Sequence, residues 1–192
     1  MLVGTFSLEV GMRHMFVAVL AGALLLPHTT LLAQAGKAGP VVVLETTKGT
    51  IEIETFDDAP KSAEHFVDLA RKGFYRGQRF HWVKDGLAQA GDPLSRDLTK
   101  KTEWGTGGSG PKFVNKPIGV AETSKRKFER GIVGLAYRTN YKPETADSQF
   151  FILSGANPAL NGKYAPLGKV IKGMEVVDKL EMGDVIKNVT VR

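Results

Sequence analysis

The strongest constraint on the fold is a succession of short β-forming runs that begins at residue 41 and continues to residue 192. Thr50 to Phe56, with the sequence TIEIETF, alternates apolar and polar side chains strictly, as a strand with one buried face does. It follows the β-rich run Val41 to Glu45 across the turn 47–49, so the two runs predict a hairpin. Further strands are predicted at 80–83, 131–136, 148–153, 164–171 and 185–192.

Two other segments carry apolar side chains at helical spacing. In the first, Asp57 and Asp58 are the predicted caps, Pro60 suits the first turn and Gly73 ends the helix. Its apolar stripe consists of Ala63, Phe66, Val67, Leu69 and Ala70. The second segment is 173–182. Many short strands with one helix near each end predict a mainly β fold, a closed or nearly closed antiparallel barrel capped by helices.

The glycine-rich stretch WGTGGSGP lies in the long segment 92–110. No Gly-Lys-Ser/Thr follows it and no predicted helix begins there, as a phosphate-binding loop would require. We therefore expect a flexible surface loop. The residue pattern over 112–120 does not predict any one type of secondary structure.

The first 35 residues have the layout of a secretory signal. Arg13 precedes an uninterrupted apolar run over 15–26, and 33–35, Ala-Gln-Ala, places small residues where a signal peptidase reads them. Because Glu9 puts an acid ahead of the apolar run, we expect translation to start at Met12. The mature chain is then a short flexible lead, 36–40, followed by a single domain, 41–192.

The apolar run is short for a membrane span, which needs about 20 residues. An uncleaved membrane anchor is the alternative to a cleaved signal. We expect an exported protein, periplasmic or secreted, that has no stable membrane anchor after signal cleavage.

The residue types present exclude several kinds of site. The chain has no cysteine, which excludes thiol catalysis, disulfides and cysteine-ligated zinc. The net charge of +6 is scattered, and no aromatic ladder accompanies the basic runs, so no nucleic-acid partner is expected. His65 and His81, the histidines beyond the signal, lack metal-ligand spacing. We expect no metal or cofactor, and a surface or structural role for His65.

Several motifs occur along the mature chain in a fixed order: FYRGQRFHWV, QAGDP, GTGGSG, GIVGLA, SQFFI, LNGKY and LGKV. Together, their order and spacing resemble those of the cyclophilin family of peptidyl-prolyl cis-trans isomerases. The resemblance runs from about Val41 to Arg192. It implies an eight-stranded antiparallel barrel with two capping helices. It also implies that the protein rotates Xaa-Pro amides in proline-containing polypeptides. We expect the protein to be a monomer.

The resemblance also implies a set of site residues. Gln89 matches the glutamine that holds the substrate carbonyl, and Phe151 matches the aromatic floor of the proline pocket. The remaining positions would line the pocket or lie beside the peptide backbone: Ala136, Tyr137, Gln149, Leu160 and Tyr164. The alternative for Phe151 is that it is an ordinary core residue. The alternative for Gln149 is that it only forms hydrogen bonds with the backbone.

The main departure from the family is Trp82, which stands where the family has an arginine that supplies the key donor. Tryptophan has one neutral N–H donor, whereas arginine has five donors and a fixed charge. Arg79 is expected to point to the opposite strand face, and Arg138 is a possible substitute. The chain is also one residue short between Gly86 and Gln89.

Three hypotheses follow. The first is an exported isomerase with weak or altered activity. The second is a non-catalytic prolyl-peptide binder or chaperone on the same barrel. The third is a structural module whose pocket Trp82 closes.

Overall fold

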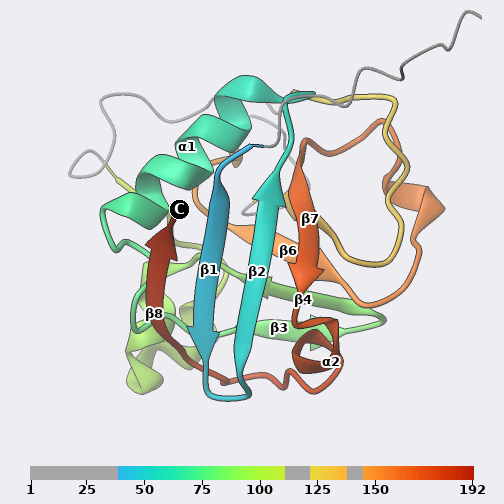
Figure 1. The fold of residues 1–192 in the computed structure, drawn as a ribbon. Coiled ribbons are helices and arrows are strands. Elements are labelled where there is room, and N and C mark those ends of the chain that lie inside the picture. Colours follow the sequence, from blue (N-terminus) through green and yellow to red (C-terminus); the bar gives the residue numbers. More distant parts are fainter. Residues whose placement is uncertain (1–38, 111–121, 138–144) are drawn as a thin grey trace, which may run out of the picture. The chain divides into compact units, whose positions relative to one another are not determined.

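The computed structural model describes residues 39–110, 122–137 and 145–192, which lie within one compact unit, Ala35–Arg192. An eight-stranded antiparallel sheet dominates the described residues (Figure 1). Its strands are β1 (Val41–Thr46), β2 (Thr50–Thr55), β3 (Trp82–Lys84), β4 (Leu87–Ala90), β5 (Ile132–Leu135), β6 (Phe150–Leu153), β7 (Pro166–Lys172) and β8 (Ile186–Val191). Two α-helices accompany them, α1 (Pro60–Arg71) and α2 (Met174–Val177). Short 3₁₀ helices lie at Pro93–Arg96, Leu98–Glu103 and Pro158–Leu160.

The sheet curls far enough for its two edges to meet. Its strand order is β3-β4-β6-β5-β7-β2-β1-β8, so β3 and β8 are the edge strands. The segment that leads into β3 is bonded to the start of β8 and to the residues just before it: Gly77 N–H donates to the Ile186 carbonyl (2.7 Å), and Phe80 N–H donates to the Asp184 carbonyl (2.9 Å). These bonds satisfy backbone groups that an open edge leaves unpaired. The predicted antiparallel barrel with two helices is therefore confirmed.

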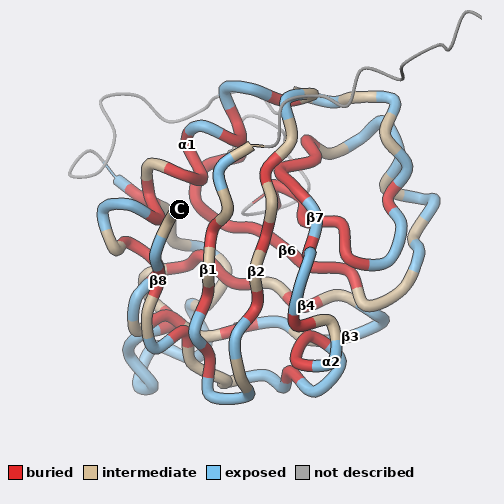
Figure 2. The backbone as a smooth tube through the Cα atoms, in the orientation of Figure 1, coloured by how far each residue is buried: buried red, intermediate tan, exposed pale blue. Residues whose placement is uncertain are grey.

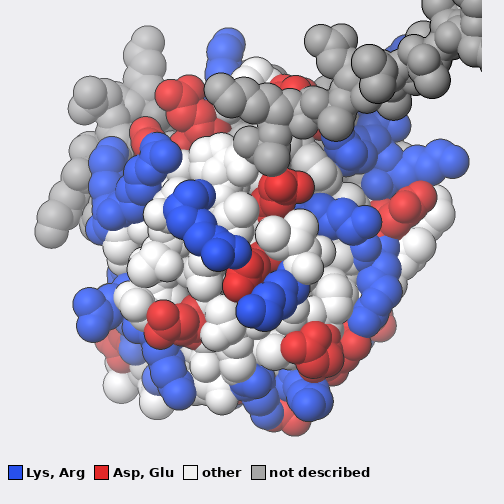
Figure 3. All heavy atoms as spheres, viewed as in Figure 1, with Lys and Arg blue, Asp and Glu red and all other residues white. Residues whose placement is uncertain are grey.

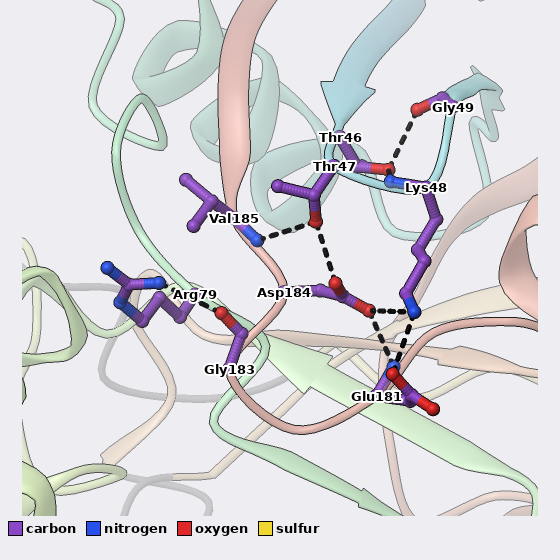
Figure 4. Close-up of polar contacts among 9 residues, drawn as sticks. All are labelled: Thr46, Thr47, Lys48, Gly49, Arg79, Glu181, Gly183, Asp184 and Val185. Carbon is purple, nitrogen blue, oxygen red and sulfur yellow. Dashed lines mark hydrogen bonds and ion pairs between the residues drawn. The ribbon is translucent and has the colours of Figure 1, made fainter.

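Side chains on the same segments hold this closure in place (Figure 4). Thr47, in the β1–β2 turn, donates its hydroxyl to Asp184 Oδ1 (2.7 Å), and Lys48 Nζ lies 2.7 Å from Glu181 Oε2. Arg79 donates to the Gly183 carbonyl (2.9 Å). The β1–β2 turn and the lead into β3 are thus both fastened to the chain just before β8.

Strand β4 was not predicted from the residue pattern. Its sequence, LAQA, contains no β-branched residue, and alanine is depleted in strands. It forms because Asp85 and Gly86 make a two-residue turn with positive φ angles of 52° and 77°, which pairs Lys84 with Leu87. An Asp-Gly pair is a strong hairpin signal, and it was the feature in the sequence that indicated this strand.

The core lies inside the curled sheet. Along β1 and β2, alternate side chains are buried and their neighbours are exposed or half-buried, as the strict alternation predicted (Figure 2). The fully buried residues of this hairpin are Val42, Leu44, Ile51 and Ile53. The first residues before β1 are also held, because the Pro40 carbonyl accepts hydrogen bonds from both the backbone and the hydroxyl of Thr55 (3.0 Å each).

Helix α1 begins differently from the prediction. Its N-cap is Ala59, which has no capping side chain, so the predicted caps Asp57 and Asp58 are wrong. Glu122 supplies the missing acceptor instead, taking a hydrogen bond from Ser62 N–H at 2.7 Å. Asp58 pairs with Arg126, and this ion pair lowers the pKa of the Asp58 carboxyl. A side chain about 60 residues away therefore accepts the hydrogen bond that a local N-cap side chain usually accepts at a helix start.

Helix α2 is a single turn, shorter than the predicted 173–182. After Val177 the backbone tightens: Lys179 N–H donates to the Val176 carbonyl and Leu180 N–H to the Val177 carbonyl. These are three-residue spacings, typical of a 3₁₀ turn at a helix end. The apolar residues of the stripe are still inward-facing, with Leu180 buried beside the core.

Basic and acidic side chains are interspersed over the face seen in Figure 3, and neither sign forms a continuous patch there. Within the described ranges, no helix has the length and hydropathy needed to cross a bilayer. The predicted signal, residues 1–35, lies outside the described residues.

Candidate functional site

Backbone pairing places four residues in one row across the sheet. Trp82 on β3 pairs with Gln89 on β4, Gln89 pairs with Phe151 on β6, and Phe151 pairs with Gly134 on β5. Directly paired residues of antiparallel strands project to the same face of a sheet. Trp82 therefore lies on the face that carries Gln89 and Phe151, as a site shared by the three residues requires.

This face forms a groove of about 610 Å³. Seven of the eight sequence-predicted site residues line it: Trp82, Gln89, Ala136, Tyr137, Phe151, Leu160 and Tyr164. The eighth, Gln149, is fully buried directly behind the lining. The structure thus brings together residues from five separate segments of the chain.

Phe151 forms an apolar floor. Its ring lies against Gly134, where an added Cβ would come within 2.8 Å of Phe151 Cε1 and Cε2. Phe128 packs beside it at 5.9 Å between ring centroids, and Tyr164 meets it edge-on at 5.5 Å. Tyr164 in turn stacks on Tyr137 at 4.5 Å. The Phe151 ring is therefore held in one orientation, with one side toward the groove.

Gln149 orients Gln89. The Gln89 amide Nε2 donates to Gln149 Oε1 (2.9 Å), and Gln149 Nε2 donates to the carbonyls of Gly105 (2.9 Å) and Gly107 (2.8 Å). Gln149 thus pairs with the backbone, and through its carbonyl oxygen it also fixes a groove residue. Among the described residues, one of the two amide hydrogens of Gln89 is bonded and the second has no partner, so Gln89 can offer it to a ligand.

The glycine-rich stretch is tied down, which corrects the expectation of a flexible surface loop. Asp92 accepts hydrogen bonds from the backbone N–H groups of Gly105 and Gly107, and Asp147 accepts from the N–H (2.7 Å) and hydroxyl (2.6 Å) of Ser109. The segment before it, predicted as loop, contains two 3₁₀ helices. Because this stretch holds Gln149, its anchoring also fixes Gln89.

His65 belongs to the same anchoring. It is buried on α1, and its Nε2 lies 3.2 Å from Asp147 Oδ1, so the predicted structural role is confirmed and a surface position is wrong. Burial by itself would raise the pKa of Asp147. The hydrogen bonds from His65 and Ser109 outweigh burial and lower that pKa.

Eight groove residues were not among those predicted for the site: His81, Lys84, Asp85, Leu87, Trp104, Gly105, Thr106 and Asn157. Burial lowers the pKa of His81, although nearby Asp92, the Gln149 side chain and the Arg79 backbone each act to raise it. Neither ring nitrogen of His81 has a hydrogen-bond partner of good geometry in the described part of the chain. His81 is therefore a buried ring in the wall of the groove, and its burial favours the neutral form.

No arginine of the described residues replaces the missing donor. Arg79 is turned away, toward the Gly183 carbonyl, as its position in the strand pattern predicted. Arg138 lies outside the described residues. Within the ranges described, no group of three or more acidic or histidine side chains is placed to hold a metal ion.

Comparisons with known proteins agree with this architecture. Residues 41–192 match the family model described as cyclophilin type peptidyl-prolyl cis-trans isomerase/CLD. A probable peptidyl-prolyl cis-trans isomerase of Brucella abortus is 39% identical over 165 residues, which cover 83% of this chain and 81% of that protein. A Helicobacter pylori peptidyl-prolyl cis-trans isomerase is 36% identical over 150 residues, covering 76% of this chain and 83% of that protein.

Solved structures give the same result. A Cryptosporidium parvum cyclophilin-type peptidyl-prolyl cis-trans isomerase has a TM-score of 0.67 and 28% identity, covering 81% of this chain and 98% of that one. A second crystal structure of that protein, determined in the presence of the dipeptide Ala-Pro, has a TM-score of 0.65. This chain belongs to the cyclophilin family of peptidyl-prolyl cis-trans isomerases.

The close approach of Phe151 to β5 predicts the effect of one methyl group. Gly134→Ala puts a Cβ into the Phe151 ring, and we expect the free energy of unfolding to fall by about 1–3 kcal/mol, as in other overpacked cores. Gly155→Ala is the control, because a Cβ there meets nothing within 4 Å. Denaturant unfolding measures both variants, and equal effects at the two positions would show that the floor tolerates displacement.

Burial of His81 predicts a pH dependence of stability. Because folding lowers its pKa below the ordinary 6.5, the unfolded chain binds a proton first as the pH falls. The contribution of the neutral ring is therefore complete above about pH 6.5 and is lost as the pH falls toward the lower folded-state pKa. Unfolding free energies at pH 7.5 and 5.5 should differ more for the wild type than for His81→Gln. Identical differences would contradict this assignment.

Proposed function

We propose that this chain is an exported peptidyl-prolyl isomerase that rotates Xaa-Pro amides in extracytoplasmic polypeptides. One observation carries the proposal: an apolar ring, Phe151, and an oriented amide donor, Gln89, lie side by side in an open groove. This is the arrangement that a proline ring and its neighbouring carbonyl would occupy. Family membership supplies the reaction class.

The reaction needs no covalent chemistry. Rotation about the C–N bond has a barrier of about 18–20 kcal/mol, because it breaks amide resonance. A site lowers that barrier by holding the twisted amide more tightly than either planar isomer. In this groove, Phe151, Leu160 and Tyr164 would hold the proline ring on one side. The rest of the amide is then free to turn.

Gln89 would hold the carbonyl oxygen. Its second amide hydrogen is available, and the fixed pairing with Gln149 means that little reorientation is needed when substrate binds. The buried glutamine behind it is locked by Gly105 and Gly107. We infer that the anchored glycine-rich stretch exists to keep this donor in place.

Trp82 weakens the electrostatic part of catalysis. It occupies the family arginine's place in the row but offers a single neutral donor. A charge-assisted contact made only at the transition state is worth about 2–4 kcal/mol, or roughly a hundredfold in rate. We therefore propose an activity well below that of an arginine-containing relative.

The second candidate function is a non-catalytic prolyl-peptide binder. The observation that favours it is also Trp82, whose side chain is 53% exposed within the groove. An exposed indole beside an apolar floor suits binding of a peptide more than stabilisation of developing charge. It also leaves the groove open, which disfavours a structural module with a closed pocket. We propose that the chain acts on proline-containing polypeptides as a monomer in either case.

The export proposal is supported by the N-terminal sequence alone. A basic residue, an apolar run over 15–26 and the small residues of 33–35 match a cleavable signal. We propose periplasmic or secreted localisation without a stable anchor after cleavage.

Activity is tested by measuring cis-to-trans isomerisation of an Ala-Pro peptide. We expect the wild type to exceed the uncatalysed rate, Trp82→Arg to raise kcat/KM by roughly tenfold or more, and Gln89→Ala to lower it by a similar factor. Leu98→Ala is the control, because Leu98 is exposed and lies outside the groove. A wild-type rate equal to the uncatalysed rate, with peptide binding retained, would establish the binder instead.

Export is tested by expressing the full chain in a Gram-negative host and determining the N-terminus of the periplasmic product by mass spectrometry. We expect a product that begins at Gly36. Ala35→Arg should block cleavage, since the peptidase requires a small residue there, and Ala38→Arg should not. Recovery of uncleaved wild type from the membrane fraction would favour the anchor.

A further inference from the structure

Four large apolar side chains are strongly exposed in the described residues, and only one of them, Trp82, lines the groove. The others are Leu98, Ile171 and Met182. The indole Nε1 of Trp82 has no hydrogen-bond partner among the residues described. An exposed tryptophan inside a ligand groove presents a large, rigid contact surface that costs little side-chain entropy to immobilise. Trp82 is therefore suited to contact a bound ligand directly.

The sheet register sets where on a ligand this contact falls. Adjacent strands lie about 4.8 Å apart, and Gln89 stands between Trp82 and Phe151 in the row. Trp82 is thus two strands away from Phe151, about 10 Å across the sheet, with Gln89 between them. A ligand that spans the row meets Phe151, then Gln89, then Trp82.

A substrate peptide can be placed along this row. With the proline ring on Phe151 and the proline carbonyl at Gln89, the chain continues toward Trp82 by about 3.3–3.6 Å per residue. We propose that Trp82 is a specificity-determining residue that selects an aromatic or large apolar side chain at the position after the proline. The inference rests on the proposed function, since it needs the proline to occupy the Phe151 floor.

The surroundings of Trp82 favour an apolar selection over a charged one. Its neighbours Lys84 and Asp85 lie on the groove and pair with each other at 3.9 Å, so their charges largely compensate. Trp104, from the segment after the second 3₁₀ helix, also lines the groove, and its indole N–H is bound to the Asp97 carbonyl (3.1 Å). Trp104 therefore adds a second aromatic ring whose polar edge is already satisfied.

The test compares dissociation constants of peptides that differ at one position. Three blocked peptides of the form Ala-Ala-Pro-Xaa-Ala, with Phe, Leu or Gly at Xaa, are titrated by NMR into the full mature chain. We expect the Phe peptide to bind about threefold to tenfold more tightly than the Gly peptide, the range of an aromatic pair. Trp82→Ala should abolish this ratio, Trp82→Phe should retain part of it, and Leu98→Ala should leave it unchanged.

A second peptide pair checks the position. Phe or Gly placed before the proline should give a ratio that Trp82→Ala does not alter, because that side of the peptide points away from β3. Wild-type affinities that are equal for the three Xaa peptides, or a ratio that survives in Trp82→Ala, would overturn the inference and leave the proposed function standing. Absence of binding by any peptide to the wild type would overturn both.

Discussion

The groove depends on one physical constraint, the antiparallel backbone pairing of β3, β4, β6 and β5. Each hydrogen-bonded ladder fixes a register, and a slip by one residue would turn every side chain to the other face. The observed registers align Trp82, Gln89, Phe151 and Gly134 in one row on one face. The neighbouring residues Ala88, Val133 and Ile152 project to the other face and form part of the core. The site and part of the core thus lie on opposite faces of the same paired strands.

Rigidity at the site comes from a series of hydrogen bonds that begins at Gln89 and ends at two buried carboxylates. Gln149 holds Gln89, the glycine-rich stretch holds Gln149, and Asp92 and Asp147 hold that stretch. Each link satisfies a buried polar group that would otherwise cost free energy. The helix contributes through His65, which contacts Asp147. A donor placed this way is preorganised, which is the property that catalysis by amide rotation requires.

Much of this could be predicted from residue patterns, and the misses have identifiable causes. The β1–β2 hairpin and α1 follow from periodicity, which records burial directly. Strand β4 was missed because its residues are poor strand formers, and the Asp85-Gly86 turn specifies it instead. The predicted caps of α1 were wrong because Glu122, about 60 residues away, takes their place. The 92–110 segment was assigned as loop because composition does not show that distant carboxylates bind it.

The sequence by itself determined the chemical inventory: an aromatic at 151, amides at 89 and 149, and a tryptophan at 82 where the family has an arginine. It also determined the apolar faces, because alternation and helical spacing are local properties of the chain. Only the tertiary structure decided that Trp82 is exposed within the groove, that Gln149 binds Gln89, and that Gly134 admits the Phe151 ring. These facts join segments up to 69 residues apart (82 to 151), and pairing between such distant segments is set by strand register and barrel closure, which no local pattern records.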